Sequence, residues 1–453
     1  MGYKNTAVGL TILFSCMANT MAAASPARTS DAPAELEAIT SKPDMQASRL
    51  ALRPKENVYM RDGSIRKLRY TWREVPNAVR YRFVVTEGDA AGAPVAYRSD
   101  YVFNNGLELP VKSEAWLDGH FFYKVCALNF HGSPISDYTR PRPLLSGSGN
   151  DMVPHITSEY EKMDYPPLYP AYSWIPVHGA SEYEVVVRER RASGHDGIVH
   201  FLYTKDLTAY DSAGYTTPGT YYWQVRALNH AREPISEWSE PCRFTVTGTA
   251  AVAALGDSIT HGGGAVTYGP DRVLYDWESY TDFPVKNLGY SGDTVEAMLG
   301  RFDRDVLPFA PKILVIMGGV NNCRQGHGSA QIIAGLAAIR DKCAANNIYP
   351  VFLTMTSLHP QKMKEVGAAA PPPAGWMETM RLVNAWIMSQ PYAVDVTTVL
   401  SDGEGRLEDI YTADGLHPDV VGKRYIGQEV SRYLRTTFPS IVTPLVRPAR
   451  VRQ

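Results

Sequence analysis

The sequence has few of the residues that mark a disulfide-stabilised, metal-binding or nucleic-acid-binding protein. Only five cysteines occur in 453 residues, too few for the disulfide framework of a small secreted domain. Their spacings match no zinc-binding pattern and the eleven histidines are scattered, so no metal and no cofactor is implied. The formal net charge is only -2. A protein without an excess of basic residues lacks the footprint that nucleic acid requires, and we expect no such partner.

Long hydrophobic runs are also missing, and the apolar run near the amino terminus is too short for a permanent membrane helix. Lys4, the apolar residues 7–14 and the small residues 22–24 together predict a signal peptide over residues 1–24. Alternatively, Leu13-Phe14-Ser15-Cys16 is a bacterial lipobox, the signal ends before Cys16, and this cysteine carries a membrane lipid anchor. Under either interpretation we expect an exported protein, which is periplasmic, at the cell surface or secreted.

The chain is long for a single core, and its composition predicts several segments. Residues 25–53 are rich in Ala, Ser, Pro and charge without a sustained period, which predicts a tether. We expect two β-domains over residues 54–147 and 148–247, an α/β domain over residues 248–440, and a basic tail over residues 441–453.

Residues 54–247 contain an internal repeat. Tyr70-Thr71-Trp72 recurs as Tyr172-Ser173-Trp174 about one hundred positions later, and the alternating run 81–85 matches 183–187. Period-two alternation with Gly and Pro turns predicts antiparallel strands that bury one face, in a domain of β-sandwich size. We expect both tryptophans to be core residues rather than ligand platforms.

At these residues the chain resembles the fibronectin type III fold. The resemblance implies two tandem β-sandwiches, with Gly147-Ser148-Gly149-Asn150 as the hinge between them. Because the repeat contains no catalytic constellation, we expect the pair to be a spacer or targeting arm. A fragment starting near Gly248 would then retain turnover.

The carboxy-terminal region has a different pattern of apolar and polar residues. Apolar runs at 251–255, 313–317 and 351–355 alternate with helix-like stretches at 329–345 and 377–388. This pattern predicts an α/β domain of three layers, αβα, in which helices cover both faces of a parallel sheet.

Gly256-Asp257-Ser258-Ile259-Thr260 directly follows the first of these apolar runs. A buried strand that ends in this way delivers a serine to the carboxyl edge of the sheet, where ligands bind in open α/β folds. By itself the pattern is weak, because a serine at such a turn more often caps a helix.

Four segments resemble, in order, the blocks of the SGNH (GDSL-type) hydrolases, over about 190 residues. The segments are Gly256-Asp257-Ser258-Ile259-Thr260, Asn287-Leu288-Gly289-Tyr290-Ser291-Gly292-Asp293-Thr294, Gly319-Val320-Asn321-Asn322 and Asp414-Gly415-Leu416-His417-Pro418. Four blocks in order at compatible spacings are far more specific than any one of them.

The resemblance implies a role for five residues. Ser258 would be the nucleophile, His417 the base that takes its proton, and Asp414 the acid that holds the imidazole in one tautomer. The backbone N–H groups of Ser258 and Gly292 and the side-chain amide of Asn321 would form the oxyanion hole. Gly292 suits this role because a residue without a Cβ lets its backbone approach a substrate.

Simpler interpretations exist for each residue taken singly. Gly292 is also typical of a turn, Asn321 of a loop cap, and Asp414-Gly415 of a plain turn. The joint occurrence of all the blocks favours the catalytic interpretation.

Three further residues need an interpretation. Asn322 stands where the family has aspartate, which puts the stability of its loop in doubt. We expect Asp257 to brace its loop rather than to serve as the triad acid. His261 is a rival base, which we expect to be a pocket-wall residue because no acid follows it at a suitable spacing.

The expected function is an exported serine esterase that removes short acyl groups, O-acetyl above all, from carbohydrate through an acyl-enzyme without a cofactor. The aromatic residues between the first two blocks either line a sugar-binding cleft or belong to the core. They are Tyr268, Tyr275, Trp277, Tyr280 and Tyr290. The alternatives are an acyl hydrolase of the lipase or lysophospholipase type, and a non-catalytic glycan-binding or adhesion protein. We predict an acylated carbohydrate or another small ester as substrate and no protein partner.

Overall fold

The computed structural model describes residues 54–442, apart from 62–63, 74, 76–77, 79, 103–105, 111–112, 130–131, 145–152, 176, 178–179, 192–195, 265–267 and 368. The expected signal peptide, Cys16, the tether, the hinge at 147–150 and the tail beyond 442 lie outside the described residues.

The first β-domain consists of two antiparallel sheets that share one core. The three-stranded sheet has the order β1-β2-β5, with β1 at Pro54–Arg61, β2 at Ser64–Trp72 and β5 at Gly106–Pro110. The four-stranded sheet has the order β4-β3-β6-β7, with β4 at Val95–Val102, β3 at Arg80–Glu87, β6 at Phe121–Leu128 and β7 at Arg142–Pro143. Tyr70 and Trp72 of one sheet pack with Phe83 and Tyr123 of the other, so the alternating aromatic residues form the interior of the domain.

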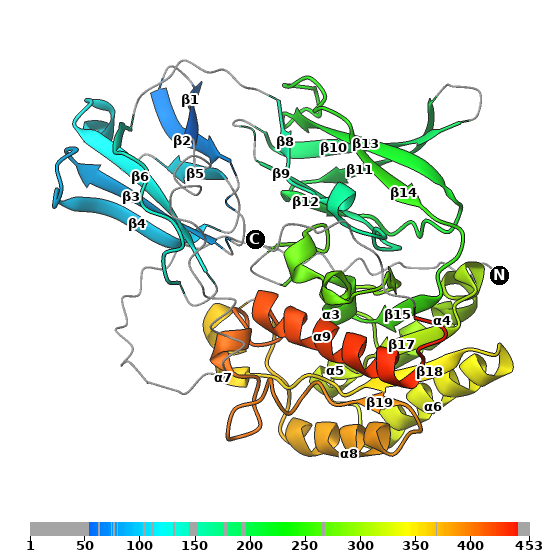
Figure 1. The fold of residues 1–453 in the computed structure, drawn as a ribbon. Coiled ribbons are helices and arrows are strands. Elements are labelled where there is room, and N and C mark those ends of the chain that lie inside the picture. Colours follow the sequence, from blue (N-terminus) through cyan, green and yellow to red (C-terminus); the bar gives the residue numbers. More distant parts are fainter. Residues whose placement is uncertain are drawn as a thin grey trace, which may run out of the picture. The chain divides into compact units, whose positions relative to one another are not determined.

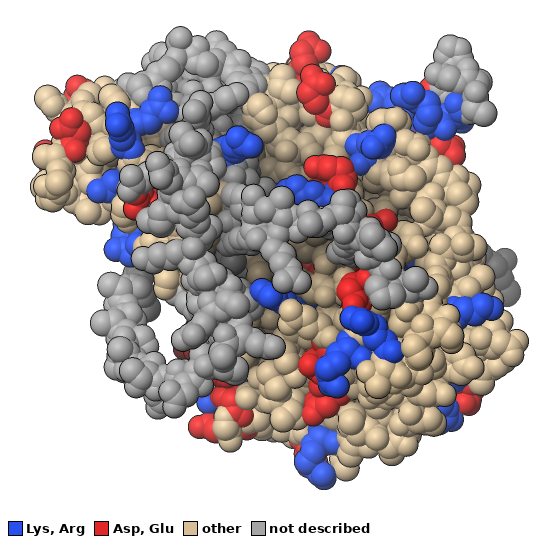
Figure 2. All heavy atoms as spheres, viewed as in Figure 1, with Lys and Arg blue, Asp and Glu red and all other residues tan. Residues whose placement is uncertain are grey.

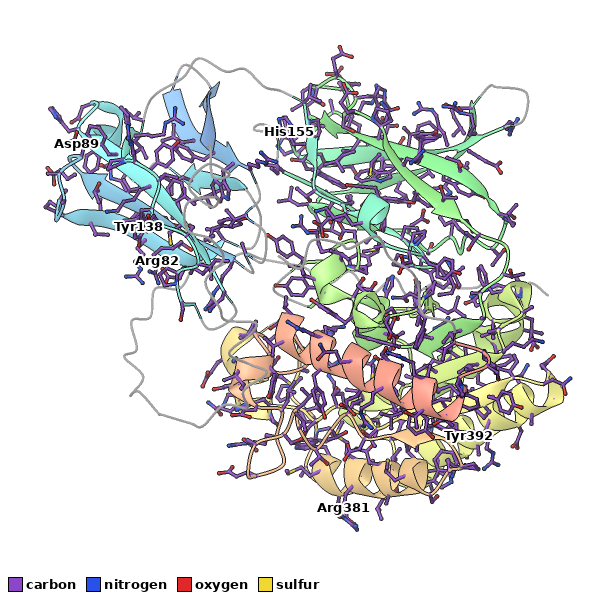
Figure 3. All side chains as sticks on the ribbon, in the orientation of Figure 1. Arg82, Asp89, Tyr138, His155, Arg381 and Tyr392 are labelled. Atoms are coloured by element: carbon purple, nitrogen blue, oxygen red, sulfur yellow. The ribbon has the colours of Figure 1, made fainter. Side chains whose placement is uncertain are left out.

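The outer face of the four-stranded sheet carries charged pairs. Arg82 of β3, labelled in Figure 3, donates two hydrogen bonds to Asp100 of β4, with Nε–Oδ1 at 2.9 Å and Nη2–Oδ2 at 2.6 Å. Tyr138 lies on the same side of this domain (Figure 3). The polar residues of the alternating pattern thus face outward, as the period of two requires.

The second β-domain repeats this strand order. Its three-stranded sheet is β12-β9-β8, with β8 at His155–Ile156, β9 at Ala171–Ile175 and β12 at Thr208–Tyr210. Its four-stranded sheet is β11-β10-β13-β14, with β10 at Glu182–Arg190, β11 at Asp196–Thr204, β13 at Gly219–Leu228 and β14 at Cys242–Val246. Figure 1 labels these strands in green and blue-green.

The repeat extends to individual hydrogen bonds. The hydroxyl of Tyr81 accepts the backbone N–H of Val75 at 3.0 Å, and the hydroxyl of Tyr183 accepts that of Val177 at 2.9 Å. Trp72 is 3% exposed and Trp174 is fully buried. The prediction that both tryptophans are core residues is confirmed.

The α/β domain is built on a five-stranded parallel sheet. Its order is β16-β15-β17-β18-β19, with β15 at Val252–Gly256, β16 at Lys286–Asn287, β17 at Ile313–Met317, β18 at Tyr349–Leu353 and β19 at Ala393–Val394. The α-helices are α3 at Ser258–His261, α4 at Val295–Asp305, α5 at Val320–Arg324, α6 at Ser329–Ala345, α7 at Pro360–Val366, α8 at Trp376–Met388 and α9 at Val420–Thr437. Its short 3₁₀ turns are η3 (Val273–Tyr275), η4 (Trp277–Tyr280), η5 (Leu307–Phe309) and η6 (Asp409–Tyr411). The first β-domain contains η1 (Glu114–Leu117) and the second contains η2 (Tyr160–Lys162). The expected parallel sheet with alternating helices is confirmed.

Helices lie on both faces of this sheet. Helix α6 contacts both α4 and α8, so these three form one layer, whereas α9 contacts η3 and η4. Figure 1 shows α9, in red, lying across one face. Every residue of β15 and β17 is buried, as expected for strands covered on both sides.

The strand order places a topological switch point between β15 and β17. The chain leaves β15 toward β16 at one edge and later returns to place β17 on the other side of β15. At such a point the connections after the two strands diverge, and ligands bind in the crevice beyond their carboxyl ends. Ser258 follows β15 and Asn321 follows β17, so both residues lie at this point of the sheet.

The second β-domain is joined to the α/β domain by more than the chain. The segment between β8 and β9, residues 157–170, is called the β8–β9 loop below. Its Leu168 N–H donates to the carbonyl of Asn287 in β16 at 2.9 Å, and Lys286 Nζ donates to the carbonyl of Pro166 at 2.8 Å. Val273 packs against the core of the second β-domain. These contacts go beyond the expectation that both β-domains are only a spacer or targeting arm, because the loop of the second one covers the edge strand of the parallel sheet.

The charged residues of the described surface are mixed. On the face that Figure 2 shows, Lys and Arg side chains are interspersed with Asp and Glu. Across residues 54–442, as far as they are described, no helix combines the length and the apolar character needed to cross a bilayer.

Candidate active site

Ser258 is positioned by the tight turn between β15 and α3. Asp257 Oδ1 accepts the N–H of Ile259 at 2.9 Å and so caps the helix that Ser258 begins. A Cβ at Gly256 would lie 2.6 Å from the carbonyl oxygen of Met317, which explains the glycine before this turn. Burial raises the pKa of the Asp257 carboxyl to about 6. Asp257 thus holds the turn, in the bracing position that we expected.

Asp414 and His417 lie in the loop that leads into α9. Gly415 between them has φ +81, and a Cβ there would lie 2.6 Å from the carbonyl oxygen of His359, so only glycine fits this turn. Asp414 Oδ1 accepts the backbone N–H groups of Leu416 and His417, each at 2.8 Å. Burial by itself would raise the pKa of Asp414, but the imidazole of His417 and these N–H donors outweigh it and hold the pKa well below its usual range.

The fold brings these three side chains into one line. His417 Nδ1 lies 2.8 Å from Asp414 Oδ2, and His417 Nε2 lies 2.9 Å from Ser258 Oγ, across 159 sequence positions. A carboxylate only accepts, so Nδ1 carries the hydrogen and Nε2 is free to accept from the serine hydroxyl. This geometry allows His417 to take the proton of Ser258 when the oxygen attacks a carbon.

Gly292 lies in a turn whose concave side is open. The N–H of Asp293 donates to the carbonyl of Tyr290 at 3.2 Å, and Gly292 has φ +91. The position that a Cβ would take at Gly292 has no heavy atom of the described residues within 4 Å. The glycine is needed for its left-handed backbone rather than for close packing.

Asn321 is held against this same turn. Its Nδ2 donates to the carbonyl of Asp293 at 2.9 Å, and its Oδ1 accepts from Arg324 Nη1 at 3.0 Å. A primary amide has two N–H groups, so one remains to meet a developing negative oxygen. The candidate oxyanion donors therefore come from the segments that follow β15, β16 and β17.

Asn322, which stands where the family has aspartate, stabilises its loop through hydrogen bonds. It is fully buried, its Oδ1 accepts the N–H of Val295 at 2.9 Å, and its Nδ2 donates to Glu296 Oε2 at 2.7 Å. The asparagine thus ties the segment after β17 to the start of α4. Aspartate could accept from Val295 but could not donate to Glu296.

His261 is occupied by other partners than Ser258. Its Nδ1 lies 2.8 Å from Ser291 Oγ, and its Nε2 lies 2.6 Å from the carbonyl oxygen of Tyr169 in the β8–β9 loop. Burial lowers the pKa of His261 to about 4, so the ring is neutral near pH 7. Tyr169 was missed by the sequence analysis, because nothing in the proline-rich run around it signals a contact with residues ninety or more positions away.

Of the two interpretations of the aromatic residues between the first two blocks, the core interpretation holds for three. Tyr268, Tyr275 and Trp277 are buried in the core, where they cannot stack on a substrate. Tyr280 and Tyr290 are partly exposed. Tyr290 packs beside the site, with its ring stacked on that of His261 at a centroid distance of 6.1 Å. Amphipathic aromatic side chains between two catalytic blocks served here mainly to fill the interior.

Within the described part of the chain, no group of three or more His, Cys, Asp or Glu side chains has the arrangement of a metal site. Cys126, Cys242, Cys323 and Cys343 are free thiols.

Comparisons with known proteins give a family and several related folds. The sequence model of the GDSL-like Lipase/Acylhydrolase family matches residues 254–425, a range that includes Ser258, Gly292, Asn321, Asp414 and His417. No curated protein sequence matches the chain significantly.

Among solved structures, the chain is similar to a lipase/acylhydrolase from Enterococcus faecalis, with 20% identity over 43% of this chain and 98% of that chain, at a TM-score of 0.35. A GDSL-like lipase from Bacteroides thetaiotaomicron matches with 21% identity over 41% of this chain and 87% of that chain, at 0.33. A mutant of an acetyl-xylooligosaccharide esterase from Geobacillus Stearmophilus matches with 19% identity over 42% and 95%, at 0.31. On the family match, the carboxy-terminal region is a GDSL-like lipase/acylhydrolase domain, and the protein is a carboxylic-ester hydrolase.

Proposed function

We propose that Ser258, His417 and Asp414 are the catalytic triad of this hydrolase, with the N–H groups of Ser258 and Gly292 and the amide of Asn321 as the oxyanion hole. The observation that supports this assignment is the unbroken hydrogen-bond line from Asp414 Oδ2 through the imidazole to Ser258 Oγ, at 2.8 and 2.9 Å. Both ring nitrogens of the other nearby histidine, His261, are occupied elsewhere.

In this proposal, Ser258 Oγ attacks the ester carbonyl carbon while its proton passes to His417 Nε2. The carbonyl oxygen becomes negative and is stabilised by the preorganised N–H donors. As the tetrahedral intermediate collapses, His417 returns the proton to the leaving alcohol and the acyl group stays on Ser258. A water molecule then attacks the acyl-enzyme, gives its proton to His417 in the same way, and releases the carboxylic acid. Asp414 stays ionised throughout and stabilises the imidazolium.

We infer that the acyl group is short, acetyl above all, and that the alcohol is a carbohydrate. The signal-type amino terminus and the appended β-domains favour a hydrolase that works outside the cell on a polymer, where tethered modules raise its local concentration. Each β-domain has one three-stranded and one four-stranded antiparallel sheet, an arrangement that supports the resemblance to fibronectin type III domains. Tyr210 of the second β-domain is half exposed, and its ring centroid lies 6.1 Å from that of His261, so an aromatic face is available next to the site.

The test compares the parent chain with Ser258→Ala on p-nitrophenyl esters from acetate to palmitate. Acetate release from acetylated xylan, pectin and sialoglycans is measured in parallel. We expect Ser258→Ala to keep its circular dichroism spectrum and to lose at least about a thousandfold in turnover. Turnover should also decline steeply beyond butyrate, with acetate released from at least one glycan. A maximum at eight carbons or longer with no acetate from any glycan would favour a lipase or lysophospholipase instead. Turnover of Ser258→Ala within tenfold of the parent would remove Ser258 from its role.

The export proposal is tested separately by the mass of the mature amino terminus after expression in a bacterial host. Cleavage near residue 24 leaves an unmodified chain, whereas a lipoprotein begins at an acylated Cys16. An intact Met1 in the fractionated protein would contradict export by either route.

A further inference from the structure

The β8–β9 loop of the second β-domain contacts the residues around Ser258 directly. Tyr169 lies in this loop, and its carbonyl oxygen is 2.6 Å from Nε2 of His261, three residues after Ser258. Because a carbonyl oxygen can only accept, His261 Nε2 must carry the hydrogen of the neutral ring. Tyr169 thereby sets the tautomer and the orientation of His261.

The other nitrogen of this ring holds the segment that contains Gly292. With the hydrogen on Nε2, Nδ1 is an acceptor, and it receives the hydroxyl of Ser291 at 2.8 Å and the backbone N–H of Ser291 at 3.2 Å. Ser291 is the residue directly before Gly292, whose N–H is a proposed oxyanion donor. A continuous hydrogen-bond chain therefore runs from the β8–β9 loop through His261 to the backbone of the oxyanion segment.

The hydroxyl of Tyr169 supports the same segment by a second route. It donates to Asp305 Oδ2 at 2.6 Å, and that oxygen also accepts from Arg301 Nη1 at 3.1 Å. Arg301 Nε in turn donates to Oδ2 of Asp293 at 2.6 Å. Asp293 is the residue directly after Gly292. All three side chains are buried in the α/β domain.

Arg301 also holds the backbone before the Gly292 turn and the backbone at the end of β15. It donates to the carbonyl of Leu288 at 2.7 Å and to that of Gly256 at 3.1 Å. The ring of Tyr169 packs edge-on against Tyr290 at a centroid distance of 4.6 Å. Tyr169 thus contacts the segment around Gly292 directly through its ring. Its carbonyl reaches the same segment through His261, and its hydroxyl reaches it through Asp305 and Arg301.

We propose that Tyr169 and His261 are positioning residues for the oxyanion hole, so that the second β-domain completes the active site of the α/β domain. This inference rests on the proposed function. Neither residue touches the substrate; they fix the place of the Gly292 N–H. An oxyanion donor is effective only when it is preorganised where the negative charge develops, and an error of about 1 Å lowers the rate strongly.

The experiment uses the full chain with four substitutions. His261→Phe keeps a ring and removes both hydrogen bonds, and His261→Asn keeps an acceptor near the Nδ1 position. Tyr169→Phe removes only the hydroxyl route. Ser158→Ala is the matched control, because Ser158 lies in the same β8–β9 loop and donates a buried hydrogen bond to Asp271 Oδ2 at 2.7 Å without contacting the oxyanion segment.

Three quantities are measured for each variant. Turnover of p-nitrophenyl acetate is expressed per active serine, counted with a fluorophosphonate, so that unfolded protein does not contribute. The inhibition constant of phenylboronic acid reports on the hole, since its serine adduct is tetrahedral and negatively charged. The melting temperature reports on stability alone.

We expect His261→Phe to lower kcat by about 10- to 100-fold with little change in KM, and to weaken phenylboronic acid by a similar factor. His261→Asn should recover part of this loss, and Tyr169→Phe should show a smaller loss of the same kind. Ser158→Ala should keep kcat and the affinity for phenylboronic acid within about twofold of the parent, even if its melting temperature falls as far as that of the other variants. A merely structural role would instead change the melting temperature without separating kcat from KM.

Two results would overturn the proposal. The first is that both His261→Asn and Tyr169→Phe keep kcat and the affinity for phenylboronic acid within twofold of the parent. These two variants test the proposal even if His261→Phe does not fold. The second is an equal loss in Ser158→Ala. The proposed function itself would be overturned if turnover by the parent chain did not depend on Ser258. Turnover of the parent and of Ser258→Ala is therefore compared before any other variant is measured.

Discussion

At the scale of single residues, the Asp414 carboxylate has the largest number of partners in the candidate triad. It accepts two backbone N–H groups through Oδ1 and the imidazole of His417 through Oδ2. These donors hold its pKa well below its usual range despite burial, so the group is an anion near neutral pH. A fixed anion beside Nδ1 is what keeps Nε2 free to accept from Ser258.

Asp414→Asn tests this role. An amide can still accept from the backbone N–H groups, but it no longer stabilises an imidazolium and can present its NH₂ to Nδ1, which favours the wrong tautomer. We expect kcat for p-nitrophenyl acetate to fall by about a thousandfold or more, with an unchanged circular dichroism spectrum. A loss below tenfold would mean that His417 is oriented by groups other than Asp414.

At the scale of elements, strand β16 depends on a loop from another domain. Only its two residues pair with β15, and its far side is covered by the β8–β9 loop through Leu168. Lys286 of β16 is buried, with Nζ bonded to the carbonyl of Pro166 and lying 5.1 Å from the ring centroid of Phe309. Burial lowers the pKa of this lysine to about 7.

This lysine should make stability depend on pH. Its pKa is about 7 in the folded chain and about 10.4 in an unfolded one. Between these values the unfolded chain binds more protons. The free energy of unfolding therefore rises with pH, by at most about 1.4 kcal/mol per unit, and this contribution is flat below pH 7. We expect urea titrations between pH 6 and 9 to show this rise in the difference between the parent and Lys286→Met. The difference is needed because buried Asp419, whose pKa is raised to about 8, acts in the opposite direction in both chains.

Lys364→Met, at an exposed position of α7, is the control for a change of net charge. Its profile should follow that of the parent. Parallel profiles for the parent and Lys286→Met would mean that Lys286 does not titrate in the folded chain over this range.

At the scale of the whole molecule, the two β-domains differ in their relation to the α/β domain despite their common strand order. Among the described residues, the core of the first contains residues of that domain alone, whereas Val273 of the α/β domain packs on the core of the second. Further bonds join the second β-domain to the α/β domain, among them Arg272 Nη1 to the carbonyl of Thr157 at 2.8 Å.

Truncation should reveal this difference. A fragment starting near Gly248 loses the carbonyl that holds His261 and the loop that covers β16, and we expect its turnover per active serine to fall at least about tenfold. A fragment starting at Val153 keeps both and should stay within about twofold of the full chain. Turnover of p-nitrophenyl acetate, normalised with a fluorophosphonate, measures both. Full activity of the shorter fragment would restore the spacer interpretation of the second β-domain.

Several features could be predicted from local order along the chain. The run at 313–317 and the stretch at 329–345 are β17 and α6 with unchanged bounds. A continuous apolar run fits a strand buried on both faces, and the buried residues of α6 (Ile332, Leu336, Ile339 and Cys343) recur at helical spacing. The repeat predicted the burial of Trp72 and Trp174, since alternation alone determines which side of a strand faces inward.

Other features were decided by the tertiary structure alone. Both His417 and His261 were candidates to meet Ser258. Only the folded arrangement of the loops around the sheet places His417 Nε2 at 2.9 Å from the hydroxyl of Ser258. Whether Tyr275 and Trp277 line a cleft or fill the core depends on what packs over them, and periodicity does not contain this information. The contact of Tyr169 with His261 joins two domains. Local sequence determines which conformation each segment prefers, but a hydrogen bond between distant residues exists only once packing has brought their backbones together. The candidate active site is assembled from such bonds.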